Sequence, residues 1–137
     1  MNNVYFNDPT FIESTSYQNF IRENPSRGYL NIRAYAANAA IPISGLNVVV
    51  SKMIDNRRVI FFEGATDASG LIRQIALPTP NISLNDQEIP SSQEYNLEAS
   101  YNNQQSLFLI KMYSNIEVNQ NVNIVPDIRL EGSTYGG

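Results

Sequence analysis

The most constraining feature of this chain is a period of two in its hydrophobic residues, which begins just after Gly28. Leu30, Ile32 and Ala34 alternate with polar or aromatic neighbours across residues 29–36. Successive side chains of a strand point to opposite faces, so this alternation predicts a strand with one buried face.

Similar stretches recur about every ten residues, a spacing typical of all-β domains. They predict seven strands, at 29–36, 46–54, 59–66, 71–77, 94–101, 106–113 and 120–128. No stretch shows a convincing helical period. The sequence therefore predicts an all-β fold, a seven-stranded antiparallel β-sandwich of the Greek-key kind. The run Leu77-Pro78-Thr79-Pro80 is expected to cross from one sheet to the other, because proline donates no ladder hydrogen bond.

Residues 1–27 have a different composition, rich in asparagine, serine and aromatic residues. Residues 16–24 allow a turn or two of helix but lack a clear period of 3.6. We expect an extended N-terminal arm at 1–27, a sandwich at 28–128 and a C-terminal tail at 129–137. A disordered leader is the alternative, although disordered segments are usually poor in aromatic residues. The aromatic residues of the expected arm are Tyr5, Phe6, Phe11, Tyr17 and Phe20.

The composition excludes several classes of site. Among the 137 residues there is no cysteine and no histidine, which removes disulfides, thiolate metal sites and Ser–His or Cys–His pairs. We therefore expect no enzyme activity and no cofactor. The net charge of −4 disfavours nucleic acid as a partner.

Targeting signals are equally sparse in the sequence. No run approaches the ~20 apolar residues of a membrane span, and the N-terminus lacks the apolar core of a secretory signal. The sequence therefore predicts a protein made in the cytoplasm that reaches a spore or cell surface without such a signal.

Several motifs resemble the carboxypeptidase-regulatory-like, or transthyretin-like, β-sandwich superfamily over about residues 28–127. The matching positions are Gly28, Ile41-Pro42-Ile43, Gly45, Val48, Thr66, Asp67 and Gly70. The resemblance implies the sandwich fold and no activity. One enzyme of this fold, a hydroxyisourate hydrolase, depends on histidines that this chain lacks, so we expect that activity to be absent.

A narrower similarity is to the non-catalytic domain of clostridial spore cortex-lytic and peptidoglycan-associated proteins. The shared stretches are Ala40-Ile41-Pro42, Thr66-Asp67 with Gly70, Leu77-Pro78 with Pro80, and 115–126. The chain departs from that pattern at Tyr101-Asn102-Asn103, where the family has Ala-Pro-Gly-Tyr. This similarity implies a spore-associated context.

Adhesin domains of this fold suggest an internal isopeptide bond, with Glu98 as the assisting carboxylate. Only Lys52 and Lys111 are available as donors, and neither lies on the first predicted strand, where the resemblance requires the lysine. Asn123 or Asp127 would be the acceptor. A plain hydrogen-bonded glutamate is the favoured interpretation.

Oxygen donors for calcium occur in two predicted turns, but without the acid spacing of a known calcium loop. They are Asp67, Ser69, Asp86 and Glu88. The favoured interpretation is an aspartate that caps its own turn.

Two functions remain open. The arm could lie along a sheet edge of a neighbouring copy, which predicts a self-assembling structural subunit of a spore- or cell-surface fibre or layer. Alternatively, an exposed aromatic face could bind peptidoglycan or another envelope glycan, as an accessory to a cortex-lytic enzyme. The tyrosines of that face would be Tyr29, Tyr35, Tyr95 and Tyr101.

Overall fold

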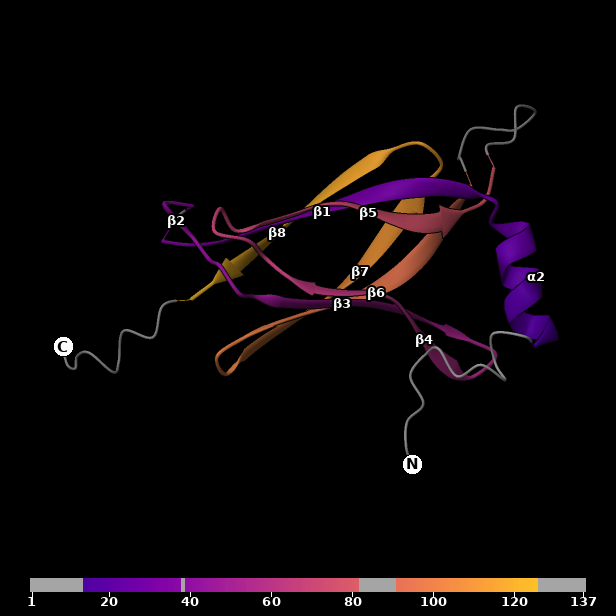
Figure 1. Ribbon diagram of the computed structural model, residues 1–137, viewed down its shortest axis with the longest axis horizontal. Helices are drawn as coiled ribbons and strands as arrows, with labels where there is room; N and C mark the ends of the chain where they lie inside the picture. The colour runs from indigo at the N-terminus through magenta and orange to yellow at the C-terminus, as the bar shows by residue number, and fades with distance from the viewer. Residues whose placement is uncertain (1–13, 38, 82–90, 126–137) are drawn as a thin grey trace.

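The computed structural model describes residues 14–37, 39–81 and 91–125. Two sheets pack face to face, and a helix lies at one end of them (Figure 1). The all-β sandwich is confirmed, with eight strands rather than seven. The elements are α2 (Thr15–Glu23), β1 (Ser26–Ala36), β2 (Ile41–Pro42), β3 (Asn47–Ile54), β4 (Arg57–Ala65), β5 (Leu71–Thr79), β6 (Ser92–Tyr101), β7 (Gln104–Tyr113) and β8 (Glu117–Ile124). The additional strand is β2, two residues within the expected turn through Pro42.

The first sheet is built around β1, which pairs antiparallel with β2 and β5 and parallel with β8. The second sheet is antiparallel throughout, in the order β4-β3-β6-β7. The parallel pair differs from the all-antiparallel expectation. It arises because the chain crosses from β7 in the second sheet back to the first and enters it at the end where β1 begins, with Tyr29 beside Glu117.

The proline run does not make the expected crossing. Pro78 and Thr79 belong to β5 and pair with Arg27 and Ser26 of β1, so the crossing to β6 comes after them. Since β5 is an edge strand of the first sheet at this point, it can hold a proline that donates no ladder hydrogen bond.

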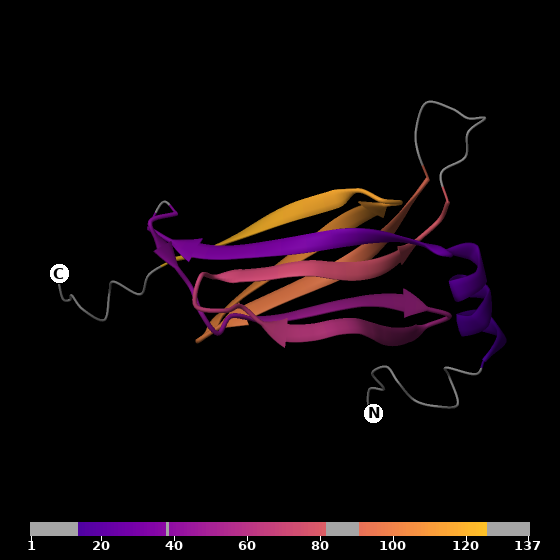
Figure 2. The ribbon, with the colours of Figure 1, turned by 45° about the horizontal axis from the view of Figure 1, so that its top comes forward.

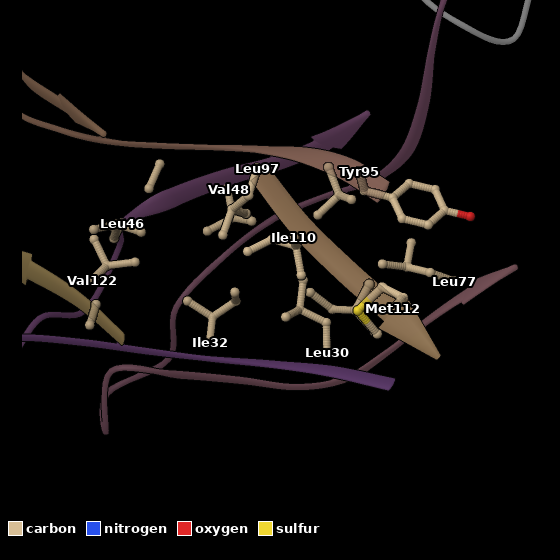
Figure 3. Close-up of a cluster of buried hydrophobic side chains, with 14 of the residues drawn as sticks. Leu30, Ile32, Leu46, Val48, Leu77, Tyr95, Leu97, Ile110, Met112 and Val122 are labelled. Atoms are coloured by element: carbon tan, nitrogen blue, oxygen red, sulfur yellow. The ribbon is translucent and has the colours of Figure 1, made fainter. Parts of the chain in front are cut away.

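The core is the layer of apolar side chains between the sheets (Figure 3). Leu30 and Ile32 of β1 face Val48 of β3 and Leu97 of β6, and all four are fully buried. The alternation in the sequence thus identified the buried face of β1 correctly.

Helix α2 covers one end of the sandwich (Figure 2). The Ser14 hydroxyl caps it by accepting a hydrogen bond of 3.2 Å from the backbone N–H of Tyr17. Phe20 is 8% exposed, and its ring centre lies 5.8 Å from that of Phe61 on β4. Tyr17 and Ile21 pack against the same core. The expectation of an extended arm is therefore wrong for residues 14–24, because spacing by three and four residues places these apolar side chains on one face of a helix.

At the opposite corner, a side chain joins the two sheets. The Gln104 carboxamide donates to the Val125 carbonyl (2.6 Å) and accepts from the Val125 N–H (3.1 Å), which is the pair of hydrogen bonds that the backbone of a neighbouring strand would make.

Among the described residues, no helix is long and apolar enough to cross a membrane.

Candidate functional site

The outer face of the first sheet carries a concentration of polar side chains. Parallel pairing sets Asn31 of β1 beside Asn119 of β8, and Arg33 beside Asn121. Together with Gln74 and Glu117, the three asparagines form what we call the carboxamide face: Asn31, Gln74, Glu117, Asn119 and Asn121.

An irregularity in β5 brings Gln74 into this group. The pairing of β1 with β5 shifts between Leu30 and Ile32, so that two residues of β5, Arg73 and Gln74, stand opposite the single residue Asn31. Gln74 takes a left-handed backbone conformation with φ of 62°. Its N–H donates to the Asn31 side-chain oxygen at 2.8 Å instead of to a strand carbonyl.

Hydrogen bonds connect most of the carboxamide face into one network. The Asn31 amide donates to Glu117 Oε1 (3.1 Å) and to Asn119 Oδ1 (3.0 Å). The Gln74 side-chain amide donates to Glu117 Oε2 (2.9 Å). Both carboxylate oxygens of Glu117 therefore accept a hydrogen bond within the network.

These residues line an open recess with a volume of about 460 Å³, within the range of small-molecule sites. Leu71, opposite Arg33 on this outer face, contributes an apolar side chain to the wall, and Arg33 and Arg73 complete the lining. Ile32 and Ile72 also border the recess, but their side chains belong to the core side of the sheet. The recess thus combines an apolar surface with amide groups that can both donate and accept hydrogen bonds.

The predicted aromatic face is only half present. Tyr29 and Tyr35 lie half-buried on β1, on the same side of the sheet as the carboxamide face. Tyr95 is 0% exposed, so its assignment to the surface is wrong. It shares the inward face of β6 with Leu97, and its hydroxyl donates to the Pro78 carbonyl at 2.5 Å. Burial raises the pKa of the Tyr95 hydroxyl well above its ordinary value.

Tyr101 is also separate from the recess. It lies half-buried on β6 in the second sheet and packs against the core. The four tyrosines therefore do not form one surface.

Only part of the expected assembly arm lies within the described residues, which begin at residue 14. Tyr17 and Phe20 pack on the chain's own core, so they are not available to a neighbouring copy. Tyr5, Phe6 and Phe11 lie outside the described residues.

The groups considered for an isopeptide bond are divided between the two sheets. Glu98 lies on the outer face of the second sheet, where Arg58 pairs with it at 3.0 Å. Lys52 donates to the Glu94 carbonyl at 2.8 Å, and its partial burial lowers its pKa. Asn123 belongs to the first sheet, beside Tyr35. Lys111 is exposed on β7 of the second sheet, and Asp127 lies outside the described residues.

The four residues considered as calcium ligands are not shown to form one site. Asp67 accepts hydrogen bonds from the N–H groups of Ser69 (2.8 Å) and Leu71 (3.0 Å). These bonds, that of Leu71 foremost, lower the pKa of the Asp67 carboxyl. Asp86 and Glu88 lie outside the described residues, and within the described part no three acidic side chains gather where a metal ion could bind.

No family model and no curated protein matches this chain. Among solved structures, the chain is similar to the 5-hydroxyisourate hydrolase of Klebsiella pneumoniae, with a TM-score of 0.51 and 14% sequence identity. The match covers 74% of this chain and 92% of the hydrolase. It supports a transthyretin-like β-sandwich, the fold that the motifs indicated.

The expectation that this chain is not an enzyme is contradicted, because the similar structure is an enzyme. The absence of histidine and cysteine excludes particular nucleophile–base pairs, and it leaves carboxylate and lysine chemistry open. At 14% identity the likeness shows the fold alone, so it assigns no reaction to this chain.

Proposed function

We propose that this chain binds a glycan of the bacterial envelope through the carboxamide face. The observation that carries the proposal is the network in which Asn31 and Gln74 hold both oxygens of Glu117. Because these side chains are fixed in advance, a ligand does not bear the entropic cost of ordering them.

The chemistry of the recess suits a sugar. Sugar hydroxyl and acetamido groups donate and accept hydrogen bonds, and carboxamides do both in return. The flatter apolar face of a sugar ring can rest on Leu71, which lines the recess. Tyr29 and Tyr35 extend the surface along β1.

Peptidoglycan is the glycan we propose, at a spore or cell surface. The motif similarity to clostridial cortex-lytic and peptidoglycan-associated domains supports this choice. In that setting the domain would hold its chain, or a lytic partner, against the insoluble polymer.

Retention on insoluble peptidoglycan tests the proposal. We expect the full chain to be retained and Asn119→Ala to bind about tenfold more weakly, the cost of roughly one hydrogen bond in the site. The matched control is Asn96→Ala, an exposed asparagine on β6 in the second sheet, which should bind like the unchanged chain. Absence of retention, or equal losses in both variants, would contradict the proposal.

A second candidate function is self-assembly, which an exposed apolar edge favours. Leu107 and Leu109 are 69% and 63% exposed on β7, an edge strand of the second sheet. Exposed apolar edges commonly pair with another chain. Since Phe20 packs on its own core, we propose this edge, rather than the helical segment, as the joint.

The sequence of β7 is compatible with pairing to a second copy. An antiparallel pair centred on Phe108 would set Leu107 opposite Leu109 of the other copy, and Gln105 opposite Lys111. Leucines would then meet, and no like charges would stand opposite each other. Such a contact is isologous and closes as a dimer, so a fibre or layer would need a further contact.

Sedimentation velocity distinguishes the two candidates. If β7 is a joint, the full chain sediments as a dimer and Leu109→Lys as a monomer. Met53→Lys provides the control, because Met53 is 53% exposed on β3, which is not an edge strand. A monomeric unchanged chain would refute the assembly role and would leave glycan binding intact.

A further inference from the structure

Two arginines line the recess beside the carboxamide face. Arg33 projects from β1, and Arg73 comes from the irregular part of β5 next to Gln74. The recess therefore holds two guanidinium groups and one carboxylate, that of Glu117, in a chain whose net charge is −4. Two guanidinium groups beside amide donors can attract an anionic ligand to this face, even in an acidic protein.

The one carboxylate of the recess, that of Glu117, interacts with side-chain amides and not with the arginines. Glu117 accepts hydrogen bonds on both oxygens from Asn31 and Gln74. Among the described residues, neither Arg33 nor Arg73 makes an ion pair. The Asp67 carboxylate interacts with Arg73 through its charge, and its Oδ1 accepts hydrogen bonds from the N–H groups of Ser69 and Leu71.

Arg33 is also oriented in advance. The carbon at the centre of its guanidinium lies 4.8 Å from the centre of the Tyr35 ring, a contact that holds the flat group while leaving its N–H donors open. An arginine held in this way suits a carboxylate or phosphate group, because its N–H donors match two oxygens at once.

We infer that the glycan bound at the carboxamide face is acidic, with a carboxylate or phosphate group held by Arg33 and Arg73. This inference rests on the proposed glycan function and adds the charge of the ligand. The sugar ring lies over the carboxamides and Leu71, and the anion extends toward the two guanidinium groups.

Three soluble probes test the inference on the full chain by titration followed by NMR. The first is a neutral N-acetylglucosamine tetramer. The second is an N-acetylglucosamine–N-acetylmuramic acid tetramer, which carries carboxylates. The third is a poly(glycerol phosphate) oligomer. We expect the unchanged chain to bind one of the two acidic probes at least ~10-fold more tightly than the neutral one, as charge-assisted bidentate contacts provide.

Charge-removing variants locate the effect. Arg73→Gln and Arg33→Gln should each reduce the preference for the acidic probe over the neutral tetramer several-fold. Arg22→Gln is the matched control, because Arg22 lies on helix α2 and bonds to Asn19. It removes the same charge from a different part of the molecule and should keep the full preference. Raising the salt to ~0.5 M should weaken the preference through screening.

Each outcome has one meaning. A preference for the muramic acid probe identifies a carboxylate as the anion, and a preference for the glycerol phosphate probe identifies a phosphate. Equal binding of the neutral and acidic probes, or an equal loss in Arg22→Gln, overturns this inference and preserves the proposed function. Failure of all three probes to bind overturns both.

Discussion

Gln74 offers a direct test of whether the site is built at the expense of stability. A non-glycine residue with φ near +60° incurs about 1 kcal/mol of backbone strain, because its Cβ crowds the chain, whereas glycine does not. Gln74 has φ of 62° and is exposed on β5. We expect strain at this position to be retained in Gln74→Ala and relieved in Gln74→Gly.

The comparison of these two variants isolates the strain. Both lose the hydrogen bond from the Gln74 side chain to Glu117, so its contribution cancels in the difference. Glycine in an ordinary strand position is about 0.5–1 kcal/mol less stable than alanine. At Gln74 we expect the order to reverse, with Gln74→Gly more stable than Gln74→Ala by about 1 kcal/mol.

Urea unfolding at equilibrium measures the difference directly, from the free energies of unfolding of the two variants. Ala76→Gly is the internal control, since Ala76 is exposed on the same strand and its φ is not positive. It should lower the stability by about 0.5–1 kcal/mol. A Gln74→Gly variant no more stable than Gln74→Ala would refute the claim that this site stores strain.

Three further predictions concern the fold that supports the site. Tyr95→Phe should lower the free energy of unfolding in urea by about 1–2 kcal/mol, because the Pro78 carbonyl loses its buried hydrogen-bond donor. Gly28→Ala should lower the melting temperature markedly, since the added Cβ would lie 2.5 Å from a backbone oxygen of β7. The backbone of β7 would have to shift to relieve this contact, because no flexible side chain is involved in it. Asp67→Asn should be less stable than the unchanged chain at pH 7. The pKa of Asp67 is lowered, chiefly by the N–H of Leu71, so its stabilising effect is present above the unfolded value of about 3.9 and is lost as the pH falls through the folded value. The difference in melting temperature between the two proteins should accordingly vanish in acid, and a constant difference would contradict this account.

Local patterns in the sequence predicted the strands because burial and alternation are local properties. The alternation around Ile32 gave the inward face of β1 correctly. The same rule, applied to residues 94–101, places Tyr95 on the face of Leu97 and Ala99, so its burial could have been found. The helix was also within reach, since Ser14 is a good N-cap and Phe20 and Ile21 follow Tyr17 at helical spacing.

The site could not be predicted in the same way. Its central contact, between Asn31 and Asn119, joins residues 88 apart in the chain, and only the pairing of β1 with β8 brings them together. Nothing in the sequence of β5 marks Gln74, because glutamine is not a residue associated with a left-handed conformation. Register and local irregularity are properties of the assembled sheet, so they leave no clear local signal.

The parallel pairing of β1 with β8 also determines when the site comes into existence. Among the described strands, β1 is synthesised first and β8 last, and contacts between distant parts of a chain form slowly. A chain that ends before β8 therefore has Asn31 but no Glu117 or Asn119 beside it, and lacks the hydrogen-bond network of the carboxamide face. The carboxamide face is thus completed only when β8 has joined β1.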